Sequence, residues 1–274
     1  MLDIRNLSFS YGSTQALKDV SLSLKENEIL AVVGESGSGK STMLRCILGL
    51  AGSGGSAGRR LCCAGSVPRQ GEILFEGKNL LGMTDKQMRG IRGHEIAMVF
   101  QHPSQSFDPV TKIGRQAFEA ARAHEKISRW DVERRMCDLL AEMNITEPDR
   151  VLSSYPFELS GGMCQRAALA LAMMFRPKLL LADEPTSALD VTVQAQVIRS
   201  MQKLRREYKT AILIVTHNIG VAAYMADCMA VMYQGQIVEY GNTKALIRNP
   251  RHAYSQKLIA SVPVLEVNHG GVVC

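Results

Sequence analysis

The sequence lacks the features that mark several classes of protein. Its seven cysteines form no Cys-x-x-Cys pair and have no histidine at the spacing of a zinc site, which argues against zinc-ribbon and dithiol redox proteins. The N-terminus, MLDIRNLSFSYG, has neither the basic residues nor the apolar run of a signal peptide. We therefore expect a cytosolic chain with reduced thiols that are mostly buried or incidental. The cysteines stand at positions 46, 62, 63, 137, 164, 228 and 274.

Long runs of one residue class are also missing. The formal net charge is +6, but no Lys/Arg run or basic-aromatic ladder concentrates it, so the pattern favours scattered solvated charges over a nucleic-acid surface. Residues 211–233 are apolar enough to suggest a membrane span, but His217, Asn218 and Asp227 interrupt them. A strand, a loop, a short helix and a second strand are the better interpretation. No sustained heptads are present either.

What the chain does contain indicates an α/β fold. Its 274 residues suffice for one large domain, and 46% of them are hydrophobic. Strand patterns crowd the first third, and the later strands 178–183 and 211–217 flank a crossover helix at 191–208. We predict a single domain over 1–274 with a mainly parallel sheet, an antiparallel β subdomain and a helical subdomain inserted over about 103–175. The Gly/Ser-rich stretch around 52–65 is assigned no chemistry.

A glycine-rich loop follows the apolar run ILAVV and opens a helix. It fits the pattern G-x-x-x-x-G-K-[ST], in which backbone N–H groups at a helix N-terminus surround phosphate oxygens. Lys40 is expected to reach the β- and γ-phosphates, and the Ser41 hydroxyl to bind Mg²⁺. The predicted phosphate-binding residues are Gly34, Glu35, Ser36, Gly37, Ser38, Gly39, Lys40, Ser41 and Thr42.

Two adjacent carboxylates close the buried run LLLAD. Neighbouring residues of a strand point to opposite sides, so Asp183 and Glu184 should differ in role. We predict that Asp183 holds Mg²⁺ through its water shell and that Glu184 is the general base for the attacking water. The same pair alone could be an ordinary strand end, but the phosphate loop upstream favours the catalytic interpretation.

Gln101 and His217 follow two other predicted strands. A lone histidine or glutamine after a strand is more often structural than catalytic. Ligands of open parallel sheets, however, bind beyond the carboxyl ends of the strands. Both side chains are therefore predicted to face the phosphates.

A second Ser-Gly-Gly turn stands in the stretch ELSGGMCQR. Ser160, Gly161 and Gly162 at a helix start offer unpaired N–H groups and a positive dipole end, so they could bind phosphate without a lysine. An ordinary capped helix would fit the same letters.

These motifs together resemble the ATP-binding cassette family, a group of P-loop NTPases, over nearly the whole chain. They occur in the family's order: Tyr11, GESGSGKST, Gln101, LSGGM, LLLADE, SALD and His217. The resemblance implies an adenine-stacking role for Tyr11, a nucleotide-site role for Asp190 of SALD, and a magnesium site of Ser41, Gln101 and Asp183. It also implies that two cassettes pair head to tail, so that Ser160–Gly162 of one chain close over ATP held by the other.

Longer stretches resemble the branch of the family that powers importers of peptides and nickel. They are QHPSQSFDPVTKIG, YPFELSGGMCQR, DEPTSALDVTVQAQV and RHAYSQKLIASVP. The chain ends without the cysteine cluster of many peptide-importing members, which favours nickel slightly. The sequence identifies neither the substrate nor whether the partner cassette is identical.

The resemblance implies an ATPase subunit on the cytoplasmic face of the membrane that uses ATP and Mg²⁺. Its expected partners are a second cassette and two permease subunits, with a periplasmic or extracellular substrate-binding protein as an indirect partner. For the second cassette, a non-identical sister is expected in preference to an identical chain. No nucleic acid is expected. The alternatives are a soluble cassette protein of ribosomes or DNA and a phosphonate-processing accessory cassette.

Overall fold

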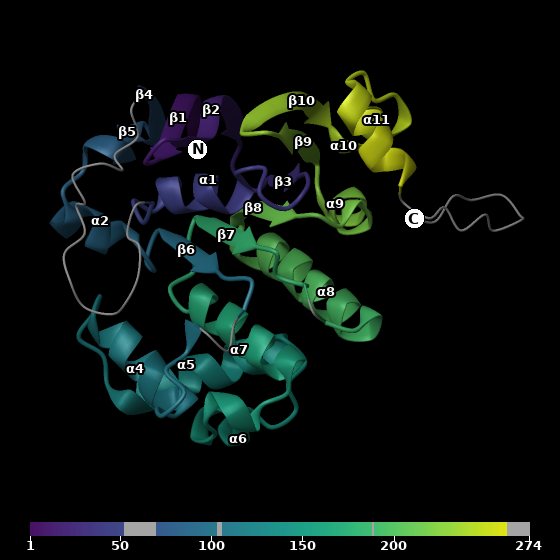
Figure 1. Ribbon diagram of the computed structural model, residues 1–274. Coiled ribbons are helices and arrows are strands. Elements are labelled where there is room, and N and C mark those ends of the chain that lie inside the picture. The colour runs from purple at the N-terminus through teal and green to yellow at the C-terminus, as the bar shows by residue number, and fades with distance from the viewer. Residues whose placement is uncertain (52–69, 103–105, 188, 262–274) are drawn as a thin grey trace, which may run out of the picture. The chain divides into compact units, whose positions relative to one another are not determined.

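The computed structural model describes residues 1–51, 70–102, 106–187 and 189–261. The chain divides into two compact units (Figure 1). The first unit comprises residues 1–88 and 213–274, and the second comprises residues 89–212. Each unit is described by itself. The Gly/Ser-rich stretch 52–65 and the chain end after Ser261 lie outside the described residues.

An antiparallel sheet forms the start of the first unit. Its strand order is β2-β1-β4-β5, and β1 pairs with β2 from Leu2↔Leu24 to Tyr11↔Thr14. Apolar residues of β1 alternate with more exposed ones, as expected for a strand with one face in the core. This confirms the predicted antiparallel β subdomain. The strands are β1 (Leu2–Tyr11), β2 (Thr14–Leu24), β4 (Gln70–Phe75) and β5 (Lys78–Asn79).

The first unit also contains strands in the order β10-β9-β3-β8. β3 and β9 are parallel, from Leu30↔Cys228 to Val33↔Val231, and β9 and β10 are antiparallel. All five residues of β3, ILAVV, are buried, which fits a strand covered on both faces. These strands are β3 (Ile29–Val33), β8 (Ala211–Thr216, in this unit from Leu213), β9 (Cys228–Tyr233) and β10 (Gln236–Asn242).

Short helices complete the first unit. The sequence predicted the helix after the phosphate loop and the short helix between β8 and β9, but it assigned no element after Tyr233. There the structure has β10 and two helices. The helices are α1 (Lys40–Ile47), η1 (Leu80–Gly82), α2 (Asp85–Ile91, which continues into the second unit), α9 (Ile219–Met225), α10 (Thr243–Arg248) and α11 (Ala253–Ala260).

The second unit combines a parallel strand pair with helices. β6 and β7 pair from Ile96↔Leu179 to Val99↔Ala182. The helical periodicity predicted after Ile113 is confirmed by three helices, and the predicted crossover helix matches α8 at both ends. The elements are β6 (Ile96–Val99), α4 (Ile113–Arg122), α5 (Arg129–Glu142), α6 (Pro148–Ser153), η2 (Pro156–Glu158), α7 (Gly161–Met173), β7 (Leu179–Asp183) and α8 (Val191–Tyr208).

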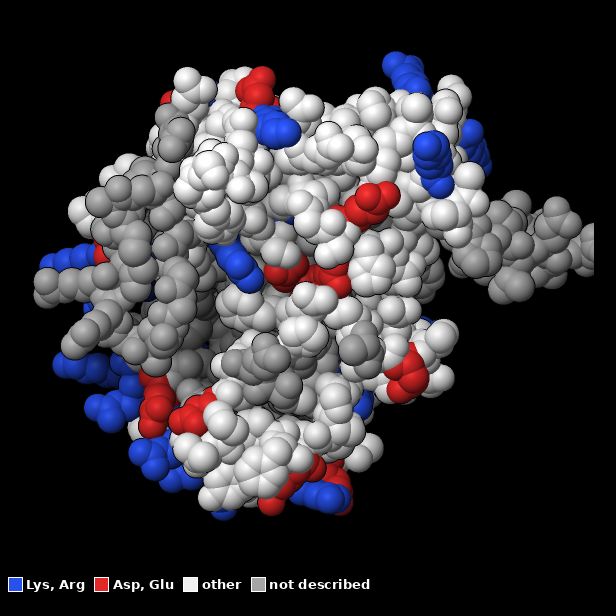
Figure 2. Space-filling view, viewed as in Figure 1, with Lys and Arg blue, Asp and Glu red and all other residues white. Residues whose placement is uncertain are grey.

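Several surface charges in the helical part of the second unit are paired. Arg115 contacts Glu119 at 3.0 Å, and Arg129 contacts Glu133 at 2.7 Å, each one turn apart on a helix. On the face drawn in Figure 2, basic side chains occur in several separate places rather than as one continuous patch. The predicted scatter of charge is therefore seen on that face. Within the part of the chain that is described, no helix is long and apolar enough to cross a membrane.

Candidate nucleotide site

The phosphate loop of the first unit folds around its own lysine. Lys40 begins α1 and is only 5% exposed. Its Nζ donates to the carbonyl oxygens of Gly34 at 2.8 Å and Glu35 at 2.7 Å, and to Ser38 Oγ at 3.3 Å. The loop thus brings together four of the residues that the motif predicted, with the ammonium at their centre.

Two glycines of the loop are required by close packing. A Cβ on Gly34 would lie 2.2 Å from the Met232 carbonyl oxygen, and one on Gly39 would lie 2.6 Å from the Ala16 carbonyl oxygen. Gly39 also has φ of +106°, which side chains rarely tolerate. Any larger residue would push the loop away from β2 or β9. The glycine spacing of the motif therefore has a packing cause in this chain.

Tyr11 and His217 also belong to the first unit. Tyr11 ends β1 with 40% of its surface exposed, and its ring meets Phe9 edge-on at 4.8 Å. His217 directly follows β8 and is exposed. The next residue, Asn218, caps α9 by accepting from the Val221 backbone nitrogen at 3.3 Å. The expectation that His217 stands at a strand's carboxyl end is confirmed.

In the second unit, Asp183 and Glu184 differ because the chain turns between them. Asp183 is the last residue of β7 and is 4% exposed. Glu184 is half-buried and has φ of +46°, a left-handed backbone that is uncommon for residues other than glycine. The two carboxylates were expected to diverge by strand alternation, but Glu184 lies outside the strand. The turn is the actual cause.

Gln101 contacts Glu184. Its Nε2 donates to Glu184 Oε2 at 2.9 Å, although the residues are 83 positions apart. The parallel pairing of Val99 with Ala182 explains this proximity, because it brings the carboxyl ends of β6 and β7 to the same edge. An amide donor at this distance fixes the orientation of the carboxylate. The structure therefore brings together two residues that the sequence predicted separately.

The Ser-Gly-Gly turn opens α7, also in the second unit. Ser160 is exposed and is the N-cap residue, and its Oγ accepts from the Met163 nitrogen at 3.3 Å. Gly162 is buried, and a Cβ there would lie 2.4 Å from Val193 Cγ1. The capped helix weighed as an alternative is thus real. Capping does not exclude a binding role, because the N-terminal dipole of α7 remains.

Arg166 ties the start of α7 to the end of α5. Its Nε donates to the Gly162 carbonyl at 3.2 Å, and its NH1 donates to the Met143 and Asn144 carbonyls at 3.2 and 3.1 Å. Partial burial lowers the pKa of the guanidinium below its ordinary value. The side chain stays charged and holds the turn through carbonyl oxygens at the end of α5.

Asp190 has a local structural function. It is exposed and is the N-cap residue of α8, where its Oδ1 accepts from the Val193 nitrogen at 2.9 Å.

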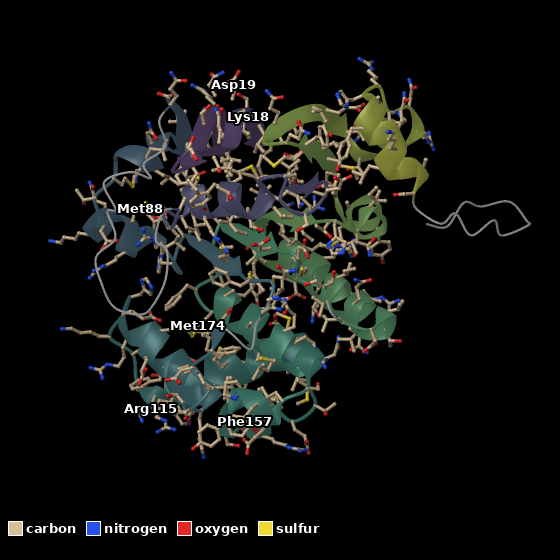
Figure 3. All side chains as sticks on the ribbon, in the orientation of Figure 1. Lys18, Asp19, Met88, Arg115, Phe157 and Met174 are labelled. Atoms are coloured by element: carbon tan, nitrogen blue, oxygen red, sulfur yellow. The ribbon has the colours of Figure 1, made fainter. Side chains whose placement is uncertain are left out.

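Phe157, just before the Ser-Gly-Gly turn, is 73% exposed, and its ring stacks on Tyr155 at 5.5 Å. Figure 3 shows Phe157 and Arg115 on the outer side of the helices of this unit. Phe157 and the N-cap residue Ser160 are thus two exposed side chains just before α7.

Of the hollows in the described part of the second unit, two bear on the predicted site. One, of about 290 Å³ and mostly apolar, is lined by residues that include Phe100, Ser106, Phe107, His124 and Phe175. The segment after Gln101 was expected to be an exposed loop. This is correct at Ser106 but wrong at Phe107, which is buried because its ring lines the hollow. Pro103 and Ser104 of that segment lie outside the described residues.

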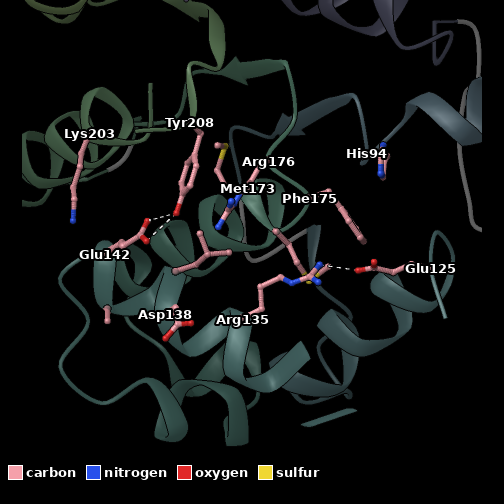
Figure 4. A pocket seen from close by; sticks show the side chains of 13 residues that line it. His94, Glu125, Arg135, Asp138, Glu142, Met173, Phe175, Arg176, Lys203 and Tyr208 are labelled. Atoms are coloured by element: carbon pink, nitrogen blue, oxygen red, sulfur yellow. Dashed lines mark hydrogen bonds and ion pairs between the residues drawn. The ribbon is translucent and has the colours of Figure 1, made fainter. Parts of the chain in front are cut away.

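The other hollow, of about 940 Å³, is drawn in Figure 4. Its lining includes Arg135, which pairs with Glu125 at 2.7 Å, and Tyr208, which donates to both oxygens of Glu142 at 2.8 and 2.9 Å. None of the predicted site residues lines it. Most of its charged groups therefore already have partners within the protein.

Sequence reasoning missed one contact of the phosphate loop. The Tyr254 hydroxyl, on α11, accepts from the Glu35 backbone nitrogen at 2.9 Å. No motif or periodicity indicates it, because the two residues are 219 positions apart. Only the fold shows that the C-terminal helix of the first unit reaches the loop.

Comparisons with known proteins agree with this geometry. Residues 17–187 match the family model described as "ABC transporter", and residues 238–272 match "Oligopeptide/dipeptide transporter, C-terminal region". The chain is 43% identical over 270 residues to the oligopeptide transport ATP-binding protein OppD of Bacillus subtilis, covering 97% of this chain and 73% of the relative. It is 41% identical over 267 residues to the probable D,D-dipeptide transport ATP-binding protein DdpD of Escherichia coli, covering 96% and 78%.

A solved structure supports the fold. The ATP-binding cassette MJ0796, in a dimer described as a post-hydrolysis state with ADP and Pi, aligns with a TM-score of 0.75 at 27% identity, covering 89% of this chain and 99% of that one. The fold predicted from the sequence is confirmed. On the family match and the identities above, this chain belongs to the ABC transporter family as one of its ATP-hydrolysing cassettes.

Proposed function

We propose that this chain is the ATP-hydrolysing subunit of an importer that takes up peptides through separate permease subunits. The observation that carries the proposal is the match of residues 238–272 to the C-terminal region of oligopeptide and dipeptide transporters, together with about 40% identity to peptide-transport cassettes. The slight preference for nickel gains no support from these relatives. The soluble and phosphonate-processing alternatives are weaker, because neither explains the C-terminal match.

The residues proposed to bind ATP and to hydrolyse it are found in both units, and each has its own role. The phosphate loop, Gly34 to Thr42, binds the phosphates, and Tyr11 stacks on the adenine. Glu184 is the general base that takes a proton from the attacking water, while the Gln101 amide holds its carboxylate in place. His217 contacts the γ-phosphate. The buried Lys40 ammonium, held by loop carbonyls, supplies the fixed positive charge for phosphate oxygens.

We propose Mg²⁺ as the cofactor, held by Ser41, Gln101 and Asp183. The donors fit a hard cation because all can offer oxygen, and the Asp183 carboxylate is buried. The described residues include no group of three or more His, Cys, Asp or Glu side chains suited to a metal, so nucleotide phosphates would have to complete the coordination. When bound, the ion would neutralise charge that develops on the phosphate oxygens.

Two cassettes are proposed to share their sites. Ser160, Gly161 and Gly162 of one cassette would close over the γ-phosphate held by the other, with Asp190 beside the same interface. The exposed start of α7 and its dipole support this, because they offer N–H donors without a lysine. A non-identical sister cassette is our preferred partner, and an identical chain is the other possibility.

The permease is proposed to dock on the apolar hollow beside Ser106. Both the hollow and the residue that senses the nucleotide, Gln101, belong to the second unit, and the segment that lines the hollow follows Gln101 within a few positions. A movement of Gln101 could therefore reach the docking surface through a short stretch of chain. Under this proposal the chain works at the cytoplasmic face of the membrane, with a periplasmic or extracellular binding protein as an indirect partner.

The test is an ATPase assay on the transporter isolated from membranes with this chain. A peptide importer should hydrolyse ATP faster when its binding protein is loaded with di- or oligopeptides, and should not respond to Ni²⁺ or chelated nickel. Stimulation by nickel alone would overturn the peptide assignment. Isolation of the chain with ribosomes or DNA, and without any permease, would overturn the importer assignment.

A further inference from the structure

The C-terminal helix of the first unit contacts the phosphate loop through one tyrosine. The Tyr254 hydroxyl oxygen accepts a hydrogen bond from the Glu35 backbone nitrogen at 2.9 Å. Tyr254 is only 9% exposed, and its ring stacks on Tyr233 at 4.2 Å with 29° between the planes. Tyr233 ends β9, which pairs with β3, the strand that leads into the loop. The tyrosine is therefore anchored on the same strands as the loop.

The bonded N–H belongs to the peptide group that also holds Lys40. Glu35 N–H and Gly34 C=O are the two ends of one planar peptide unit. The Gly34 oxygen accepts from Lys40 Nζ at 2.8 Å, while the Glu35 nitrogen donates to Tyr254 at 2.9 Å. Because the unit is planar, fixing its N–H also fixes the direction of its C=O. Tyr254 and Lys40 thus hold the same peptide from opposite ends.

The position of Tyr254 is itself well determined. The Glu239 carboxylate accepts from the backbone nitrogens of Arg251 at 2.9 Å and His252 at 3.1 Å. His252 then caps α11, since its Nδ1 accepts from the Tyr254 nitrogen at 3.1 Å. These bonds fix the first turn of α11 against β10, where Glu239 lies. A small displacement of this turn would move the hydroxyl away from Glu35.

We infer that Tyr254 is a positioning residue for the phosphate-binding lysine, acting through the Gly34–Glu35 peptide. The inference rests on the proposed function, because it takes Lys40 as the group that binds ATP phosphates. It also gives the region matched as the transporters' C-terminal region a direct contact with the nucleotide loop. A change in α11 would then alter ATP affinity without touching the nucleotide.

Tyr254→Phe in the full chain is the test. Phenylalanine keeps the ring and its stacking on Tyr233 but removes the acceptor. We expect the Kd for ATP, measured by equilibrium dialysis, to rise about threefold to tenfold, the range for one hydrogen bond. In the assembled transporter the KM for ATP should rise by a similar factor, while kcat changes less. The matched control is Tyr240→Phe, which removes a hydroxyl that donates to the Ser23 carbonyl at 2.9 Å elsewhere in the first unit.

Hydrogen exchange of the phosphate loop is measured alongside the Kd for ATP. Hydrogen exchange of the peptide that contains residues 34–40 should be faster in Tyr254→Phe than in the parent chain, and unchanged in Tyr240→Phe. Equal affinity and equal exchange in Tyr254→Phe and the parent would overturn the inference. Lys40→Ala separates a failure of the proposed function from a failure of the inference about Tyr254. If it leaves ATP binding intact, the proposed role of the loop fails; if it abolishes binding while Tyr254→Phe does nothing, only the inference fails.

Discussion

Glu184 combines an uncommon backbone with a fixed side chain. Its left-handed φ of +46° costs free energy, on the order of 1 kcal/mol or more, which the surrounding structure must offset. What the conformation provides is a carboxylate that leaves the direction of β7 and meets Gln101 at 2.9 Å. A strained residue at the end of a buried strand is typical of a functional position. This supports the proposal that Glu184 is the general base and that Asp183 holds Mg²⁺.

The first prediction concerns this carboxylate. Glu184→Gln keeps the size of the side chain but removes its ability to accept a proton. ATP binding should be unchanged, and hydrolysis should fall by about 10²-fold or more, the size of general-base effects. Binding is measured by equilibrium dialysis and hydrolysis by phosphate release with the partner subunits present. Glu133→Gln, on the surface of α5, is the control and should change neither. Near-normal turnover in Glu184→Gln would remove it as the base.

The second prediction concerns His124 and acid. Burial lowers the pKa of His124 below its ordinary value of 6.5, nearby His94 lowers it further, and Glu125 partly opposes both. A depressed histidine pKa stabilises the fold above pH 6.5, and that contribution is lost as the pH falls through the folded-state pKa. The melting temperature should therefore drop less between pH 7.5 and 5 in His124→Gln than in the parent. His102→Gln, at an exposed histidine, should keep the parent's drop. An equal drop in all three would contradict the prediction.

At the scale of elements, the first turns of α7 and α8 pack closely at Gly162, which has no side chain. Gly162 lies in the first turn of α7, where a Cβ would come within 2.4 Å of Val193 in the first turn of α8. The close approach brings together the starts of two helices, each with its own side-chain cap. Ser160 caps α7 and Asp190 caps α8. The glycine of this turn is thus needed for packing, whatever the turn binds.

The third prediction tests this packing with two neighbouring glycines. Gly162→Ala should destabilise the protein by about 1–3 kcal/mol, because Val193 or the helix must shift. Gly161→Ala should be neutral or slightly stabilising, since its Cβ would lie 3.8 Å from Leu189 Cδ2, an ordinary contact, and alanine favours helix. Urea unfolding measures both. If the two variants unfold at the same urea concentration, the packing argument is wrong.

Elements with a strong local signal could be predicted from the sequence. Runs such as ILAVV and LLLAD became fully buried strands, and α8 has the predicted ends because Asp190 caps it and Lys209 ends it in a left-handed conformation. β10, α10 and α11 could not be predicted, because short segments of mixed polarity acquire structure through contacts such as Glu239 with the start of α11. Site motifs were likewise predictable, but the Tyr254–Glu35 contact depends on folding alone.

At the scale of the whole molecule, the predicted nucleotide residues are divided between the two units. The phosphate loop, Tyr11 and His217 belong to the first, while Gln101, Asp183, Glu184, Ser160–Gly162 and Asp190 belong to the second. Under the proposed function, the phosphate loop therefore belongs to the first unit and the proposed general base to the second. Under the proposed function, the second unit, which contains Gln101 and the apolar hollow, transmits the ATP-bound state to the permease.

The last prediction tests whether the second unit contacts the permease in a way that depends on bound ATP. A cysteine at exposed Ser106, beside the apolar hollow, should crosslink to a cytoplasmic loop of the permease, and the yield should change when ATP is trapped by Glu184→Gln. Ser106 is preferable to Phe107, because a cysteine at the buried position 107 would be shielded from the reagent and would also remove a ring that lines the hollow. Ser153→Cys, also exposed and in the same unit but absent from the lining of the hollow, is the control and should not crosslink. The parent chain gives the background from native cysteines. Reactive Ser106→Cys that crosslinks in neither nucleotide state, with the permease present, would show that this hollow is a surface without a partner.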